Sequence, residues 1–238
     1  MIGLKIALVA GATGLVGQHL VSELLAKYDV VKIVSRRKTD FQNQSKVQEY
    51  IVDFDKLEKE GELFKDVDDV FVCLGTTMKK AKSRKQFVKV DYVYPLKLAN
   101  LAKLMGVKKF LIVTAIGADR EAKFFYSRVK GKLEEELVSI GLPSLHIFRP
   151  SLLTGKRQEF RLGESVSEWV SKPLSFLLVG AYEKYRPVKG KYVAMTMCAI
   201  AQEESSGVHI YESDKIRQLG KAIIQESYHE TIPKGEIE

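Results

Sequence analysis

A tyrosine and a lysine four residues apart are the side chains in this sequence best suited to proton transfer. Tyr126 and Lys130 fall within a stretch of helical periodicity, and residues at positions i and i+4 of a helix share one face. A phenol ordinarily has a pKa near 10, and a nearby ammonium group lowers that pKa because it stabilises the phenolate. Lowering the pKa from about 10 toward 7 takes roughly 4 kcal/mol of differential stabilisation. The pair could then protonate a carbonyl oxygen or deprotonate an alcohol.

Thr114 is a third candidate, because it ends a strand-like run shortly before the Tyr126 helix. Its hydroxyl could hydrogen-bond a substrate oxygen, or Thr114 could be an ordinary β-branched strand residue. A similar alternative applies to Tyr126 and Lys130, since their spacing also occurs by chance on exposed helices. The four histidines and two cysteines show no metal-ligand spacing, so we predict no metal site.

An N-terminal strand-like run, Leu4–Ala10, passes directly into three glycines spaced three residues apart. Gly11 permits a tight turn, Gly14 lets the backbone approach a pyrophosphate, and Gly17 allows close packing of helix on sheet. The following helix offers free N–H groups and a partial positive charge to an anion. No Lys-Ser or Lys-Thr pair follows, which disfavours a nucleoside-triphosphate loop. We predict a dinucleotide site with contacts from Gly11, Thr13, Gly14, Leu15, Val16 and Gly17.

The end of the second strand-like run is basic, whereas an acidic residue there would select NAD by binding the ribose 2′-hydroxyl. Arg36 and Arg37 stand at this point, and a guanidinium fork can hold a 2′-phosphate through two parallel hydrogen bonds. We predict that NADPH is preferred over NADH, with Arg36 as the main phosphate ligand and Arg37 beside it. The alternative is a solvated basic turn. Asp53, followed by Phe54, is the expected adenine contact and can also cap a helix over Lys56–Leu63.

Strand-like and helix-like segments alternate through the first 150 residues. Apolar strands separated by helices favour an α/β fold with a doubly wound parallel sheet covered on both faces. The predicted strands are Leu4–Ala10, Val30–Ser35, Val47–Val52, Val70–Leu74, Phe110–Thr114 and Leu145–Arg149, and two of the helices are Tyr92–Met105 and Lys123–Ile140.

After residue 150 the alternation weakens. We expect residues 1–150 to form the nucleotide-binding core and residues 151–238 a small C-terminal lobe that completes the same domain and walls the substrate pocket. Arg157 and Arg161 could meet an anionic substrate there or pair with nearby glutamates. The predicted elements are helices over Ser165–Val179, Tyr192–Ala201 and Asp214–Ile224 and a strand over Val208–Tyr211, with a loosely held tail or an oligomer contact at Glu230–Glu238.

Composition favours an ordinary soluble globular protein and not a disordered or fibrous one: of 238 residues, 45% are hydrophobic and 29% are charged. No apolar run approaches the roughly 20 residues needed to cross a bilayer, and the N-terminus shows no signal peptide. Two cysteines exclude a disulfide scaffold. From these features we expect a protein of the reducing cytoplasm with no membrane contact.

The net charge of +8 is concentrated in one run, which holds six basic residues and no acidic one between Lys79 and Lys89. Such a run can attract nucleic acid, with a steep salt dependence. Aromatic residues do not interleave with it as a stacking platform requires, so we favour a solvated loop and helix start, and a nucleic-acid partner is disfavoured.

The glycine turn, the Tyr126/Lys130 pair and the order between them resemble the short-chain dehydrogenase/reductase superfamily. Further motifs resemble its atypical group, typified by the Tat-interacting protein oxidoreductase, and the likeness covers roughly residues 4 to 165. These motifs are Cys73-Leu74-Gly75-Thr76-Thr77, Phe87-Val88-Lys89-Val90-Asp91, Gly117-Ala118-Asp119, Val129-Lys130-Gly131 and Phe148-Arg149-Pro150-Ser151, with Gly155, Arg157, Arg161, Gly163 and Glu164 beyond them.

The resemblance implies an NADP-binding Rossmann fold in which Leu74, Gly75 and Thr76 line the cofactor. It also implies that Tyr126 is the acid/base and that Lys130 holds the nicotinamide ribose. Thr114, or Ala115 without a hydroxyl, stands where the family carries its active-site serine. Asp91 stands where many extended relatives carry Asn.

Two functions remain open at this stage. The first is an NADP-dependent oxidoreductase of a small carbonyl or alcohol substrate. The second is an NADPH-sensing binding protein with little or no turnover. Related proteins often form homodimers through the helices that here carry Lys97 and Tyr126, so a homodimer is expected.

Overall fold

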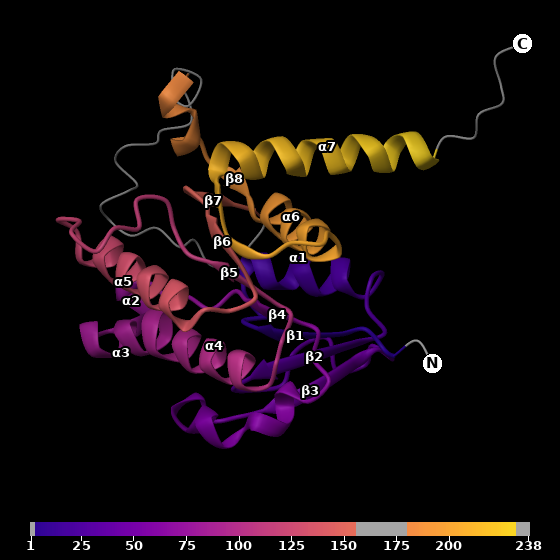
Figure 1. The fold of residues 1–238 in the computed structure, drawn as a ribbon. Coiled ribbons are helices and arrows are strands. Elements are labelled where there is room, and N and C mark those ends of the chain that lie inside the picture. The colour runs from indigo at the N-terminus through magenta and orange to yellow at the C-terminus, as the bar shows by residue number, and fades with distance from the viewer. Residues whose placement is uncertain (1–2, 156–179, 232–238) are drawn as a thin grey trace, which may run out of the picture.

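The structure, a computed structural model, describes residues 3–155 and 180–231 and is built around one seven-stranded sheet (Figure 1). Every neighbouring pair of strands is parallel, in the order β3-β2-β1-β4-β5-β6-β9. This confirms the predicted doubly wound sheet. The order reverses between β1 and β4, which opens a crevice at the carboxyl ends of the strands, called here the carboxyl edge. The strands are β1 (Ile6–Ala10), β2 (Val30–Ser35), β3 (Val47–Ile51), β4 (Asp69–Val72), β5 (Lys109–Val113), β6 (Ser144–Arg149) and β9 (Gly207–Glu212).

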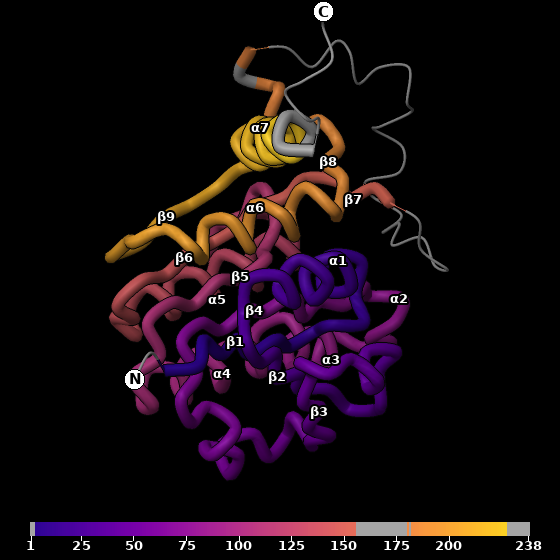
Figure 2. The backbone as a smooth tube through the Cα atoms, turned by 90° about the vertical axis from the view of Figure 1, so that its right-hand side faces the viewer, coloured from indigo at the N-terminus to yellow at the C-terminus, as the bar shows by residue number. Residues whose placement is uncertain are grey.

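Helices cover both faces of the sheet, as its apolar strands require (Figure 1). α1 and α6 pack on one face, in a core cluster that includes Val9 and Phe71. α4 and α5 pack on the other, where Leu98 and Leu133 contact a second cluster around Leu8. α7 lies outside α6 as an additional layer (Figure 2). Among residues 3–155 and 180–231, no helix is both long and apolar enough to span a membrane. These helices are α1 (Leu15–Leu24), α4 (Tyr94–Leu104), α5 (Phe125–Ile140), α6 (Gly190–Gln202) and α7 (Ser213–Thr231).

The helix predicted over Tyr92–Met105 is the second half of a longer helical run. α3 (Arg84–Val88) leads into a π-helical turn, η3 (Lys89–Val93), which leads into α4. The junction residues keep right-handed helical dihedrals, so the three pieces form one continuous rod. π-Helical turns shift the facing of side chains and concentrate at functional sites. This one carries Asp91.

The segment after β3 also differs from its prediction. In place of a single helix over Lys56–Leu63 there are two short 3₁₀ helices, η1 (Phe54–Lys59) and η2 (Gly61–Phe64). Asp53 caps the first, as predicted, by accepting a hydrogen bond from the Asp55 backbone N–H. A short α-helix, α2 (Met78–Ala81), follows β4 and ends at Lys82, which has a positive φ of 59°.

The C-terminal elements complete the sheet and its outer layer. α6, β9 and α7 correspond to the predicted helix at Tyr192–Ala201, strand at Val208–Tyr211 and helix at Asp214–Ile224. Two short strands, β7 (Leu153–Thr154) and β8 (Val188–Lys189), pair in parallel, and a 3₁₀ helix, η5 (Gly180–Tyr185), precedes β8. The helix predicted over Ser165–Val179, Arg157, Arg161 and the last seven residues lie outside the described residues.

A leucine of the glycine turn packs against the C-terminal elements. Leu15 opens α1 and is buried. A Cβ added at Gly155, just after β7, or at Gly190, which opens α6, would lie 2.8 Å from a Leu15 side-chain carbon. The lack of a Cβ at both glycines therefore allows Leu15 to pack closely against β7 and α6.

A buried histidine joins the edge strand β9 to β6. His146 Nε2 lies 3.0 Å from Ser205 Oγ, and its Nδ1 lies 3.1 Å from the Tyr211 hydroxyl. Its ring stacks on His209 with centroids 4.9 Å apart. Burial, together with the charges of His209 and Lys109, lowers the pKa of His146 from 6.5 to about 4.

We expect the free energy of unfolding to fall as the pH is lowered from about 6.5 to about 4. In this window the unfolded chain protonates His146 and the folded chain does not, which costs up to about 3 kcal/mol in all. Urea unfolding at several pH values should show a flatter profile for His146→Gln, while His209→Gln should keep most of the wild-type slope. Equal slopes in the wild type and His146→Gln would contradict this account.

Candidate nucleotide site and catalytic residues

The glycine turn lies at the carboxyl end of β1, where the fold opens its crevice. Gly11 has a φ of 95°, and a Cβ there would lie 2.6 Å from the Cys73 carbonyl. A Cβ at Gly17 would lie 2.1 Å from the Gly11 carbonyl oxygen. Side chains at these two positions would therefore push the turn away from β4 or the helix away from the turn.

The start of α1 is open toward that crevice. Gly14 occupies the N-cap and provides no side-chain cap, while its own N–H bonds to the Gly11 carbonyl. Thr13 is exposed, and Leu15 and Val16 are buried with backbone N–H groups in the first turn. First-turn N–H groups and the positive end of the helix dipole form a ready anion site. The geometry suits a pyrophosphate.

The basic turn after β2 presents its arginines to solvent. Arg36 and Arg37 are exposed, and within the part of the chain that the structure describes neither guanidinium has a hydrogen bond or ion pair. Arg36 lies near the Tyr94 hydroxyl, which donates to Asp55 over 2.9 Å. Burial and this hydrogen bond raise the pKa of Tyr94 to about 12, and the charge of Arg36 opposes that rise. The arginines are thus available to a phosphate beside Asp53.

Asp53 and Phe54 play different structural parts. The Asp53 carboxylate caps η1 and remains largely exposed, so the cap leaves it accessible. The Phe54 side chain is 4% exposed, and its ring packs 5.4 Å from that of Tyr94. Any contact of Phe54 with a nucleotide therefore falls to its backbone, and both residues stay predictions as ligands.

The loop after β4 is fastened to the helical rod behind it. Leu74, Gly75 and Thr76 are half-buried, and the Thr76 backbone N–H donates to Asp91 over 2.8 Å. Asp91 projects from the π-helical turn η3. The other oxygen of the same carboxylate receives Lys130 of α5, with Nζ at 2.8 Å. One aspartate therefore joins the predicted cofactor loop to the predicted catalytic helix.

The Lys130–Asp91 pair is enclosed by protein, with side chains 3% and 1% exposed. Buried charges are tolerated only when paired, and breaking such a pair from one side is strongly destabilising. The pairing also bears on chemistry, because Asp91 offsets the charge that Lys130 would otherwise present to a phenol. The i, i+4 spacing predicted Lys130 as a site residue. Asp91 was noted in the sequence only as part of a motif that resembles the family, and no ion pair with Lys130 was predicted.

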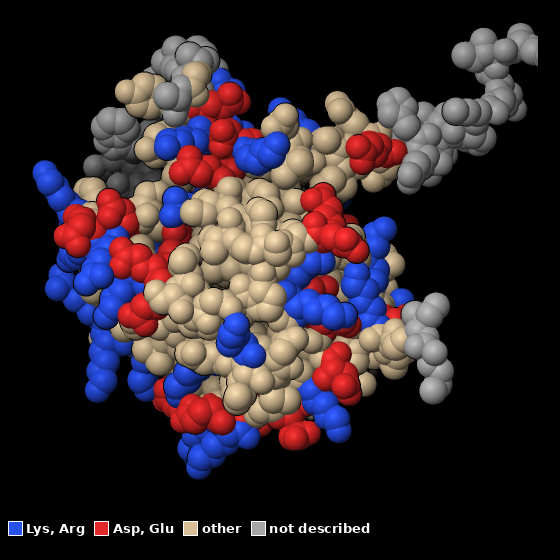
Figure 3. Space-filling model, in the orientation of Figure 1, with Lys and Arg blue, Asp and Glu red and all other residues tan. Residues whose placement is uncertain are grey.

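Tyr126 lies one turn before Lys130 on α5, as the spacing predicted. Its side chain is 41% exposed, and its ring lies 5.7 Å from that of Phe87 on α3. α3 therefore forms a wall beside Tyr126. The basic residues of α2 and α3 are exposed there, and Figure 3 shows Lys and Arg side chains gathered over this side of the molecule.

Thr114 follows β5 directly, but its hydroxyl faces α5. It is 5% exposed, and its Oγ donates to Glu134 over 2.6 Å. Glu134 also pairs with Arg149, whose Nε lies 3.0 Å from Oε2. The predicted contact of Thr114 with a substrate stays a prediction and would require this hydrogen bond to change. Sequence patterns gave no signal for Glu134, since a glutamate on a helix is usually exposed.

A glycine after Lys130 lets the loop that follows β5 lie directly on α5. A Cβ at Gly131 would lie 2.2 Å from the carbonyl carbon of Asp119, whose N–H donates to the Ser127 carbonyl. Two of the motifs noted in the sequence, Gly117-Ala118-Asp119 and Val129-Lys130-Gly131, are therefore two halves of one contact. That contact fixes the first turns of α5.

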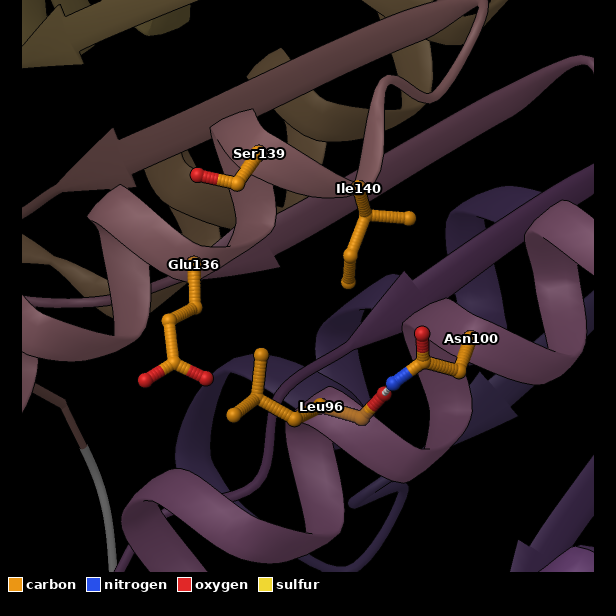
Figure 4. A pocket seen from close by; sticks show the side chains of 5 residues that line it. All are labelled: Leu96, Asn100, Glu136, Ser139 and Ile140. Carbon is orange, nitrogen blue, oxygen red and sulfur yellow. Dashed lines mark hydrogen bonds between the residues drawn. The ribbon is translucent and has the colours of Figure 1, made fainter.

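A groove of about 380 Å³ lies elsewhere, on the outer side of α4 and α5 (Figure 4). Its lining residues are Leu96, Asn100, Glu136, Ser139 and Ile140, and none of them is a predicted site residue. The groove is therefore not part of the candidate active site.

The sequence matches the NAD(P)H-binding family over residues 11–158, from the first glycine of the turn to beyond β7. The chain belongs to this family. Within it, HTATIP2 of Rattus norvegicus is 34% identical over 222 residues, which cover 91% of this chain and 90% of that protein. FMP52-1, mitochondrial, of Scheffersomyces stipitis is 32% identical over 237 residues, covering 91% and 99%. The predicted resemblance to the Tat-interacting protein group is confirmed.

A solved structure shows the same fold at low identity. UDP-glucose 4-epimerase from Thermotoga maritima superimposes with a TM-score of 0.66 and 18% identity, covering 96% of this chain and 84% of the epimerase. The Rossmann architecture of the NAD(P)H-binding family therefore extends through the described C-terminal elements.

The names of similar proteins contradict the predicted cytoplasmic location. Several similar members of the family are named as mitochondrial proteins. The prediction failed because free cysteines indicate a reducing environment and do not distinguish one reducing compartment from another.

Proposed function

We propose that this member of the NAD(P)H-binding family is an NADP-dependent oxidoreductase that transfers hydride to or from a small carbonyl or alcohol. The observation that supports the proposal is the Lys130–Asp91–Thr76 connection, which joins Lys130, one turn after Tyr126 on α5, to the loop after β4. Proton-transferring side chains and a nucleotide-binding loop in one crevice suit hydride chemistry with coupled proton transfer.

The residues present fit the dinucleotide. Because Gly11 and Gly17 carry no Cβ, the turn packs directly against β4 and the start of α1, and the first turn of α1, which has no side-chain cap, offers N–H groups to the pyrophosphate. Arg36 would hold the 2′-phosphate, and Lys130 the nicotinamide ribose. The nicotinamide, when bound, supplies or accepts the hydride.

In this proposal Tyr126 manages the proton. Its hydroxyl gives a proton to the carbonyl oxygen in reduction, or takes one from an alcohol in oxidation. Lys130 favours the phenolate, and Asp91 holds the Lys130 ammonium in place through a fixed ion pair. β7, β8 and η5 would wall the substrate side of the crevice.

The Lys130–Asp91 pair also gives the second candidate function its support. Because Asp91 offsets the charge of Lys130, the phenol of Tyr126 receives less help toward ionisation than an unpaired lysine would give. An NADPH-sensing protein with little turnover would tolerate that arrangement. The substitution of Tyr126 described below separates the two functions.

The 2′-phosphate contact predicts cofactor preference. Arg36→Ala should weaken NADPH binding about 10- to 100-fold, because a charge-assisted bidentate hydrogen bond is lost, and should leave NADH binding within about twofold. Isothermal titration calorimetry with each nucleotide measures this. Lys59→Ala removes one exposed positive charge from nearby η1 and is the matched control. Equal wild-type affinities for NADPH and NADH would refute the assignment.

The proton-transfer role predicts a loss of turnover in Tyr126→Phe. The rate of NADPH-dependent reduction should fall about 10²- to 10⁴-fold, while NADPH affinity stays within about twofold. Tyr92→Phe is the control, because it also removes one phenol hydroxyl, which here donates to Glu136. Turnover that is unaltered in Tyr126→Phe would contradict the catalytic role. Wild-type protein that binds NADPH but reduces no carbonyl would favour the sensing function.

We further propose a homodimer through α4 and α5. The exposed side of α5 is basic in its first half, at Arg128 and Lys132, and acidic in its second half, at Glu135 and Glu136. A two-fold axis across the middle of α5 would set each basic half against a partner's acidic half. The charge-reversing pair Arg128→Glu and Lys132→Glu should weaken self-association at least roughly tenfold, as measured by analytical ultracentrifugation. A monomeric wild type would refute the dimer.

A further inference from the structure

Three polar side chains follow one another along the inner side of α5. Tyr126, Lys130 and Glu134 are each four residues apart and therefore occupy neighbouring turns of one face. Tyr126 is 41% exposed, while Lys130 and Glu134 are 2% and 5% exposed. The stripe thus runs from the surface of the protein into its interior, and Glu134 is its inner end.

The Glu134 carboxylate binds the ends of two adjacent strands at once. Oε1 accepts the Thr114 hydroxyl at 2.6 Å, just after β5. Oε2 accepts Nε of Arg149, the last residue of β6, at 3.0 Å, and a second Arg149 nitrogen at 2.5 Å. β5 and β6 are neighbours in the sheet. One side chain of α5 is therefore fixed to the carboxyl edge from two directions.

This arrangement is costly if packing is its only purpose. A buried ion pair adds little net stability compared with apolar residues of the same volume, and its best-supported use is to specify one conformation. Leu133 and Leu137 already bury the apolar side of α5 in the core. Apolar contacts of leucines do not fix the orientation of a helix. The directional hydrogen bonds of a carboxylate at position 134 fix both the rotation of α5 about its axis and its position along that axis.

We propose that Glu134 is a positioning residue that sets where α5 presents Tyr126 over the carboxyl edge, and that Thr114 and Arg149 act through it. The proposal rests on the proposed oxidoreductase function. Lys130 fixes α5 to η3, and Glu134, one turn later, fixes it to β5 and β6. Two polar attachments on successive turns leave α5 little freedom to roll or slide. In this arrangement Thr114 serves the site by orienting Glu134.

The test compares Glu134→Gln with Glu121→Gln. Both changes remove one negative charge, but Glu121 lies in the loop before α5 and its side chain is 88% exposed. The position of Tyr126 is followed by its ring ¹³Cζ resonance in tyrosine-labelled protein, assigned by its absence in Tyr126→Phe. The hydride-transfer rate with NADPH and a carbonyl substrate is measured in parallel.

We expect Glu134→Gln to move the Tyr126 resonance and to lower kcat about 10- to 100-fold, with KM for NADPH within about twofold, because a displacement near 1 Å can cost this much. Glu121→Gln should change neither. If Glu134→Gln leaves the resonance and kcat unchanged, the proposal is overturned. If the resonance moves only in Glu134→Gln and the wild type transfers no hydride, the positioning role holds and the oxidoreductase function fails.

A double variant separates positioning from folding. Glu134→Gln strands the Arg149 guanidinium, which by itself lowers the thermal stability. Glu134→Gln combined with Arg149→Met removes that unpaired charge and should recover most of the lost melting temperature. We expect the Tyr126 resonance and kcat to remain altered, because both strand attachments are still weakened. Recovery of the resonance and of kcat together with stability would show a purely structural role.

Discussion

The buried ion pair between Lys130 and Asp91 is the constraint on which the arrangement of this site depends. Two charges so far from water must face each other closely, and the carboxylate has a second oxygen that takes the Thr76 N–H. Asp91 therefore fixes the relative positions of three parts of the fold: α5, the continuous helical run of α3, η3 and α4, and the loop after β4. A π-helical turn provides the local change of facing that brings Asp91 to this point. The nucleotide loop and the candidate catalytic helix cannot shift independently.

Close backbone approaches at glycines complete that register. Gly11 and Gly17 bring β1, β4 and α1 together around the nucleotide turn, and Gly131 brings the loop after β5 onto α5. Gly155 and Gly190 then receive Leu15, so the C-terminal elements pack on the same turn. Each approach is shorter than a Cβ allows. These close contacts limit the movement of the elements around the crevice. A site that aligns a cofactor with a phenol requires such rigidity.

The family relationship covers the residues that build this geometry. The NAD(P)H-binding match spans residues 11–158 and therefore the turn, the Asp91 rod and α5. Two relatives at 32–34% identity each cover 91% of the chain. Asp91 both positions Lys130 and offsets its charge, so an oxidoreductase and a nucleotide-sensing protein could share this scaffold. The two functions differ in the role of Tyr126, whose hydroxyl transfers a proton in the oxidoreductase and is not needed for chemistry in the sensing protein.

The sequence alone determined the features that depend on local spacing. Apolar runs separated by segments of helical periodicity predicted the parallel sheet. The three glycines predicted the tight turn after β1, and the i, i+4 spacing predicted that Tyr126 and Lys130 share one face of a helix. Local spacing did not predict the helical segments α3 and η3 before α4, because Lys79–Lys89 is mostly basic and a π turn interrupts the 3.6-residue period. Only the tertiary structure decided that Asp91 would take Lys130 and that Glu134 would take Thr114 and Arg149. These partners are far apart in the chain, and a charged residue on a helix is expected in water unless folding brings it a partner.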